Sequence, residues 1–107
     1  MTLTELHTVL TGIGLPVAYQ AFPAATAPEM PFIVYMELGS DNFGADNVVW
    51  HSARRIEVDL LCKTRNLTLE AQIETALNSA GIYWERELDH NDDEACFVTT
   101  YNFEIGG

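Results

Sequence analysis

Basic residues are scarce in this sequence. Its 107 residues include 5 lysines and arginines against 16 aspartates and glutamates, which gives a formal net charge of -11 at pH 7. A chain with this charge is repelled over long range by nucleic acid and by anionic membranes, because both are negatively charged. We therefore expect no direct nucleic-acid binding and no membrane partner.

Cysteines are also few, and long apolar runs are missing. Cys62 and Cys96 are too few for a disulfide scaffold, and they lack the clustering and the histidine spacing of a zinc site. No apolar stretch approaches the roughly 20 residues that a membrane span needs, and the first residues do not combine a basic region with an apolar run. These absences predict reduced, buried thiols and a protein made and kept inside a cell.

Enough apolar material remains for a folded core. Hydrophobic residues make up 48% of the sequence and charged residues 20%, so neither a disordered chain nor a coiled coil is expected. This length suffices for one domain and is too short for two. We expect a single α+β domain over residues 1–107.

Two segments have the apolar spacing of amphipathic helices. The first runs from Thr2 to Leu10, where Thr2 and Glu5 have the spacing of a capping box. The second follows Asn66, a favourable N-cap residue, and ends before Gly81. Its apolar positions are Leu69, Ile73, Ala76, Leu77 and Ala80.

Runs of β-branched and aromatic residues between turn formers predict the strands. They lie at residues 17–22, 32–38, 48–51 with 55–62 (one long strand or two collinear ones), 82–88 and 96–105. Turns are predicted at residues 39–47 and 89–94. The order α-β-β-β-α-β-β predicts an α+β fold, with a mainly antiparallel sheet of four or five strands and both helices on one face.

The residues that could carry catalysis are scattered. His7, His51 and His90 lie far apart, no nucleophile and base have triad spacing, and no glycine-rich phosphate loop opens a helix. His7 and His90 are interpreted as ordinary surface residues. We expect no catalytic residue, no cofactor and no enzyme activity.

An acidic cluster in the second predicted turn raises the question of a cation site. Its members are Asp89, Asp92, Asp93 and Glu94. Their spacing lacks the helix-flanked twelve-residue calcium loop with its central glycine and terminal glutamate. A solvated turn is the simpler interpretation and no metal site is predicted, although the sequence leaves cation binding at this turn open.

Two aromatic residues each have two interpretations. Trp84 either packs in the core of the sheet or lines a contact surface. Phe43 is the one large apolar residue within the turn-forming stretch 39–47. It either folds back onto the sheet or docks into a neighbouring subunit.

Five short segments, spread over most of the chain, carry a family pattern. They are GLPVAY at residues 14–19, PFIVY at 31–35, SDNFGADN at 40–47, AGIYWE at 80–85 and TYNFEI at 100–105. Together they resemble a family of small proteins from the structural operons of tailed phages and prophages. Members of that family look like head-tail junction or tail-completion proteins, and the predicted order of elements is similar to that of ring-forming tail-terminator proteins.

The resemblance implies a non-enzymatic virion structural protein that acts by assembly. Its expected partners are further copies of the chain, in a ring, and other phage head-tail or tail proteins. Its expected location is the virion, and the host cytoplasm during assembly. The family has no catalytic motif to carry over, so the resemblance assigns no role to individual residues.

The candidate subunit contacts are inferred from the types and positions of the residues and not from the family resemblance. Phe43, Val48, Val49 and Trp50 lie in or after the turn-rich stretch and can supply the apolar attraction that like-charged subunits need. The alternative function is a small intracellular ligand-binding or regulatory module of α+β fold. Such a module would need a well-formed pocket with convergent polar groups.

Overall fold

The computed structural model describes residues 1–22, 28–45, 48–92 and 95–106, with the backbone alone for residues 40–45 and 48–53. The elements are α1 (Leu3–Thr11), β1 (Val17–Tyr19), β2 (Phe32–Ala45), β3 (Val48–Cys62), α2 (Leu67–Ser79), β4 (Trp84–Asn91) and β5 (Cys96–Gly106). This is the predicted order of elements, and the α+β class is confirmed.

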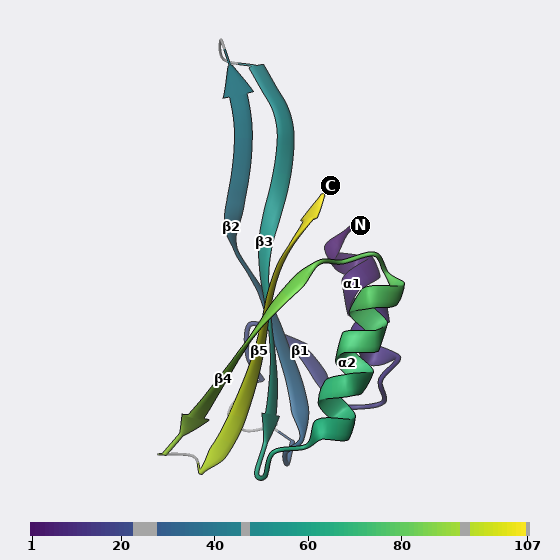
Figure 1. The fold of residues 1–107 in the computed structure, drawn as a ribbon, viewed down its shortest axis with the longest axis vertical. Helices are drawn as coiled ribbons and strands as arrows, with labels where there is room; N and C mark the ends of the chain where they lie inside the picture. Colours follow the sequence, from purple (N-terminus) through teal and green to yellow (C-terminus); the bar gives the residue numbers. More distant parts are fainter. Residues whose placement is uncertain (23–27, 46–47, 93–94, 107) are drawn as a thin grey trace.

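The five strands form one sheet in the order β1-β2-β3-β5-β4 (Figure 1). The sheet is mainly antiparallel, as predicted, but β1 and β2 run parallel, with Val17 opposite Ile33 and Tyr19 opposite Tyr35. Parallel neighbours need a crossover connection rather than a tight turn. The proline-containing stretch between β1 and β2 provides that connection.

The first strand is shorter than predicted. It was expected to reach residue 22 but ends at Tyr19. Gln20 has a φ of 68°, and its N–H donates to the Tyr35 carbonyl at 2.8 Å. The Ala21 N–H donates back to the Tyr19 carbonyl at 2.9 Å, so the chain turns sharply at this point and leaves the edge of the sheet.

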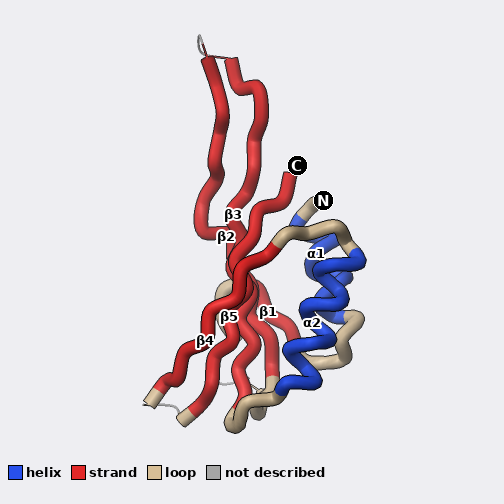
Figure 2. Tube along the Cα trace, viewed as in Figure 1, coloured by secondary structure: helices blue, strands red, loops and turns tan. Residues whose placement is uncertain are grey.

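The predicted turn over residues 39–47 is wrong for most of its length. Strand β2 continues to Ala45 and β3 begins at Val48, while residues 46–47 lie outside the described part (Figure 2). Glycine, aspartate and asparagine disfavour strands locally, but here the ladder with β3 supplies backbone hydrogen bonds that outweigh this preference. The two segments 48–51 and 55–62 therefore belong to one strand.

The predicted turn over residues 89–94 is also too long. Asp89, His90 and Asn91 belong to β4, where they lie opposite Val98, Phe97 and Cys96 of β5. The hairpin ladder again extends the strand through polar residues that favour turns locally. Residues 93–94 lie outside the described part.

Both helices pack on the same face of the sheet, as predicted (Figure 1). Alternate residues of β3 and β5 form this face, since cross-strand neighbours point to the same side. The core residues of the two helices and these two strands are Leu6, Leu10, Ile56, Val58, Leu60, Cys62, Ile73, Leu77, Tyr101, Phe103 and Ile105.

The predicted caps are present. The Thr2 hydroxyl accepts the Glu5 N–H at 3.1 Å and begins α1, and the Asn66 carbonyl oxygen accepts the Leu69 N–H at 3.0 Å and begins α2. Gly81 follows α2 with a φ of 74°, a conformation that glycine adopts without a steric penalty. Cys62 and Cys96 are free and buried, as expected. Neither described helix is long and apolar enough to span a membrane.

Leu77→Ala in the buried face of α2 should lower the free energy of unfolding by about 3 kcal/mol, because Leu77 is fully buried and truncation leaves a cavity. Leu67→Ala provides the matched control in the same helix, since Leu67 is 64% exposed. The control should change stability by less than about 0.5 kcal/mol. Urea unfolding followed by circular dichroism measures both, and equal losses would contradict the assigned helix face.

Candidate functional site

A two-stranded ribbon extends from the sheet beyond its neighbouring strands. Strand β1 pairs with β2 only as far as Tyr35, and β5 ends with Gly106 opposite Ala53 of β3. We call residues 39–45 and 48–52 the hairpin arm. Residues 39–41 lie opposite residues 53–55 of β3, and beyond this point the two described strands of the arm pair only with each other. The arm projects away from the rest of the sheet (Figures 1 and 2).

The candidate contact residues fall at the far end of the hairpin arm. In the backbone register Phe43 lies opposite His51, Gly44 opposite Val49 and Ala45 opposite Val48. Trp50 is the extra residue at a register shift between the first two of these pairs. The backbone therefore brings the four predicted residues together, while their side chains lie outside the described part of the structure.

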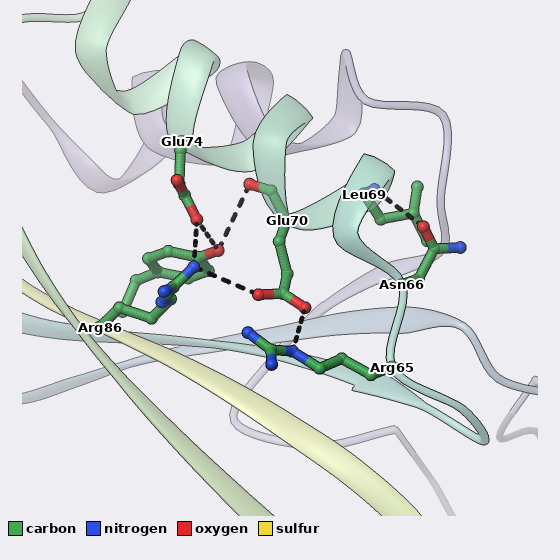
Figure 3. Close-up of polar contacts among 7 residues, drawn as sticks. Arg65, Asn66, Leu69, Glu70, Glu74 and Arg86 are labelled. Carbon is green, nitrogen blue, oxygen red and sulfur yellow. Dashed lines mark hydrogen bonds and ion pairs between the residues drawn. The ribbon is translucent and has the colours of Figure 1, made fainter.

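A buried carboxylate lies where α2 packs on the sheet (Figure 3). Glu70 is 2% exposed, although it is charged, and it accepts from two arginines. The Arg65 Nε lies 3.3 Å from its Oε2, and the Arg86 Nη1 lies 3.4 Å from its Oε1. Two cations thus compensate a charge that would be costly to bury alone.

Tyr101 and Glu74 complete this network. The Tyr101 hydroxyl donates to Glu74 Oε2 at 2.8 Å, and it lies 3.3 Å from the Glu70 carbonyl oxygen. Arg86 also contacts Glu74 Oε2, at 3.2 Å. Burial raises the pKa of the Tyr101 hydroxyl, and the adjacent Glu74 carboxylate raises it further. The network therefore holds α2 against β4 and β5 and keeps the tyrosine protonated.

Sequence reasoning missed this network, although one pattern could have revealed it. Glu70 lies three residues before Ile73 and seven before Leu77, which puts it on the apolar face of α2. A charged residue at such a position needs a partner of opposite charge. The identity of the partners, one before the helix and one on β4, depends on the tertiary structure.

The other residues considered for chemistry are placed as follows. His7 is exposed, with its Nδ1 3.1 Å from the Tyr35 hydroxyl, and His90 is exposed, with its Nδ1 2.8 Å from Asp92 Oδ1. The side chain of His51 lies outside the described part. Burial raises the pKa of the Cys62 thiol, which disfavours the reactive thiolate. Within the described ranges no three histidine, cysteine or acidic side chains are grouped to hold a metal ion.

Trp84 packs against the core of the sheet, which is the first of its two predicted interpretations. Its indole N–H donates to Asn78 Oδ1 at 2.9 Å, and its ring meets the Tyr101 ring edge to face, with centroids 5.4 Å apart. These contacts fix the start of β4 against the end of α2. The tryptophan is therefore unavailable as a free contact surface.

An open groove of about 850 Å³ lies at the base of the hairpin arm. Leu38 and Arg55 line it from the arm side, and Tyr83, Glu85 and Glu87 line it from β4 and the residue before it. Tyr83 is 84% exposed, so the groove does not enclose a ligand. Its shape differs from the enclosed, mostly apolar pockets that bind small molecules.

Asp59 lies on the opposite face of the sheet from the helices. Its Oδ1 accepts the Thr100 hydroxyl at 2.8 Å. Burial raises the pKa of Asp59 to about 7, and the neighbouring Glu57 carboxyl adds to this effect, while the Thr100 hydrogen bond opposes it. Partial burial therefore favours the protonated form of Asp59, and the nearby Glu57 carboxyl makes a smaller contribution.

Of three comparisons with known proteins, the search of solved structures shows a similar fold. A scan against protein-family models and a search of curated proteins gave no match. Among solved structures, the fold is similar to a chain in a structure described as "Virion of native gene transfer agent (GTA) particle". The TM-score is 0.60 and the sequence identity 7%, over 98% of this chain and 89% of that chain. The two chains share the fold over nearly their whole lengths.

Glu70→Gln should destabilise the protein by about 2–3 kcal/mol, because it leaves two arginines without their buried countercharge. Glu29→Gln is the matched control, since Glu29 is exposed and the same charge is removed. Chemical unfolding of both variants measures the difference. Equal stabilities would show that the ion pairs contribute nothing to the fold.

Asp59→Asn should change how stability depends on pH. In the wild type the folded protein keeps a proton on Asp59 that the unfolded chain releases near pH 4, so this residue lowers stability as pH rises from about 4 to about 7. Asparagine stays neutral and still accepts from Thr100. At pH 8 the variant should be more stable by on the order of 1–2 kcal/mol, after allowance for partial solvent screening.

Urea unfolding of wild type and Asp59→Asn at several pH values between 4 and 8 tests this pH dependence. The difference between the two curves isolates Asp59 and its interaction with Glu57, because the more distant carboxylates titrate equally in both proteins. A difference that stays constant across this range would show that Asp59 is already ionised at pH 4.

Proposed function

We propose that this chain is a non-enzymatic structural protein of a phage-like virion, at the head-tail junction or in tail completion, and that it acts by assembling into a ring. Two observations support this proposal. The fold is shared with a chain of a gene transfer agent virion over 98% of this chain, and the hairpin arm projects from the sheet. The proposed partners are further copies of the chain and other head-tail or tail proteins.

The proposed assembly depends on the hairpin arm. An isolated two-stranded ribbon is at best marginally stable in water, and its free edges invite pairing with another chain. A neighbouring subunit would supply the missing contacts. Phe43, Val48, Val49 and Trp50 are the proposed contact residues, because the register gathers them at the far end of the arm.

The proposed ring uses an asymmetric contact between subunits. The hairpin arm leaves one side of the subunit and would dock on a different surface of its neighbour. Such a heterologous contact closes into a ring when the rotation between subunits divides a full turn. The subunit would be present in the virion, and in the host cytoplasm during assembly.

The net charge sets the conditions for assembly. Subunits of charge -11 repel one another, so apolar contacts must supply the attraction. Salt weakens the repulsion, since the Debye length falls from about 30 Å at 0.01 M to about 10 Å at 0.1 M. Assembly is therefore best measured at the higher ionic strength.

The alternative, a ligand-binding or regulatory module, has weaker support. The groove at the base of the hairpin arm is its best candidate site, but the groove is open and several of its side chains are acidic. The polar groups that do converge, around Glu70, bind one another. An assembly function uses the projecting arm, which a ligand-binding module leaves without a role.

Phe43→Ser combined with Trp50→Ser should leave the subunit folded and abolish assembly. Leu67→Ser combined with Leu88→Ser is the control, because both leucines are at least half exposed and lie off the arm. Sedimentation velocity at 0.1 M salt measures assembly, alone and with the neighbouring virion proteins. Complementation of a prophage that lacks this gene measures the yield of infectious, correctly joined particles.

The control pair should assemble and complement like the wild type. A large loss of thermal stability in the arm pair would mean that the two aromatic residues fold back onto the sheet. If deletion of the gene leaves the number of infectious, joined particles unchanged, the structural role in the virion is wrong.

A further inference from the structure

The face of the sheet opposite the helices is strongly acidic. The register of β3, β5 and β4 sets their residues in rows across this face. The rows are Glu57 with Asn102 and Glu85, Asp59 with Thr100 and Glu87, Leu61 with Val98 and Asp89, and Arg55 with Glu104. We call this surface the acidic face. Its six carboxylates are Glu57, Asp59, Glu85, Glu87, Asp89 and Glu104.

The acidic face is exposed along β4 in the described structure, whereas Glu57 and Asp59 on β3 are half-buried. Both helices lie on the other side of the sheet (Figure 1). The connection between β1 and β2 contacts this side near β2, where the Phe22 and Phe32 rings lie 5.2 Å apart. Across β4 and the neighbouring part of β5, residues Glu85, Glu87, Asp89 and Glu104 are exposed.

Most lysines and arginines of the described residues lie away from the acidic face. Arg65 and Arg86 pair with Glu70 on the helix side of the sheet. Arg54 lies 3.6 Å from Glu37, also on that side. Lys63 follows the end of β3. Among the described residues, Arg55 alone brings a lysine or arginine to the acidic face, where it lies opposite Glu104.

A second copy of this chain cannot match this surface. It carries the same 16 acidic and 5 basic residues, and two of its cations are held in the Glu70 network. The hairpin arm is no better suited, because residues 39–52 include Asp41 and Asp46 and contain no lysine or arginine. Like charges brought together in this way are repulsive.

We infer that the acidic face docks a basic segment of a different protein. Lysine and arginine side chains of that segment would lie along the rows of carboxylates, and arginine can bind each carboxylate through two hydrogen bonds. Their aliphatic stems would cover the half-buried Leu61 and Val98. The requirement for a basic partner follows from the charges and holds whether or not the arm assembles copies of this chain.

Asp59 offers a direct reporter for this contact. It lies in the middle row, between Val34 of β2 and Thr100 of β5, with Glu57 beside it. Burial and Glu57 raise its pKa to about 7. A cation placed on the face favours the ionised carboxylate, so docking should lower this pKa.

The test uses a synthetic peptide of repeating Lys-Leu-Arg-Ala units as the probe, with an uncharged Gln-Leu-Gln-Ala peptide as the control for apolar binding. Calorimetry at 0.1 M salt measures affinity. Glu85→Gln, Glu87→Gln and Asp89→Asn together should weaken binding of the basic peptide at least tenfold. The matched triple Glu5→Gln, Glu29→Gln and Asp92→Asn has the same net charge and should weaken it less than threefold.

Each outcome of these measurements supports or contradicts docking at the acidic face. Equal weakening by the two triples would show that net charge alone attracts the peptide, and no binding by the wild type would overturn the inference outright. Thermal melts check that both triple variants fold. If the acidic-face triple does not fold, the single variant Glu87→Gln replaces it. Carbon-13 NMR of the Asp59 carboxyl supplies the second readout. A pKa that stays unchanged at saturating peptide would place the binding off this face.

Discussion

Burial of one face of the sheet by α1 and α2 is the constraint on which the rest of the structure depends. Leu6, Leu77 and Tyr101 are fully buried at this contact, and alternate residues of β3 and β5 complete the core. Because both helices of the described residues lie on the same side, no helix of that part of the chain covers the other face. The β2–β3 ladder runs on beyond the strands that flank it, and this produces the hairpin arm.

The shortage of cations connects the core to the surface. Glu70 occupies an apolar position of α2 and is buried with Arg65 and Arg86, because a carboxylate left alone in the core would be unstable. Two of the five basic residues are thereby committed to internal pairing. Of the lysines and arginines in the described residues, Arg55 alone lies on the sheet face opposite the helices, which carries six carboxylates. A requirement of the fold thus shapes the surface available to partners.

The proposed partners of the hairpin arm and of the acidic face differ in their chemistry. Attraction at the arm is apolar in the proposal above, and it is opposed by the net charge of identical subunits. Attraction at the acidic face is electrostatic and requires a molecule of opposite charge. A subunit that joins copies of itself to other proteins needs such a division, since one surface that fitted both would not distinguish them.

The sequence by itself determined the elements whose causes are local. Thr2 and Asn66 begin the helices, Gly81 follows the second, and the alternation of Ile56 with its neighbours gives β3 its buried side. Only the tertiary structure decided that residues 39–45 are strand, that β1 lies parallel to β2 and that Glu70 is buried with two arginines. The physical reason is the same in each case. Backbone partners and countercharges come from residues distant in the sequence, and their hydrogen bonds and charges outweigh the local preferences from which elements are predicted.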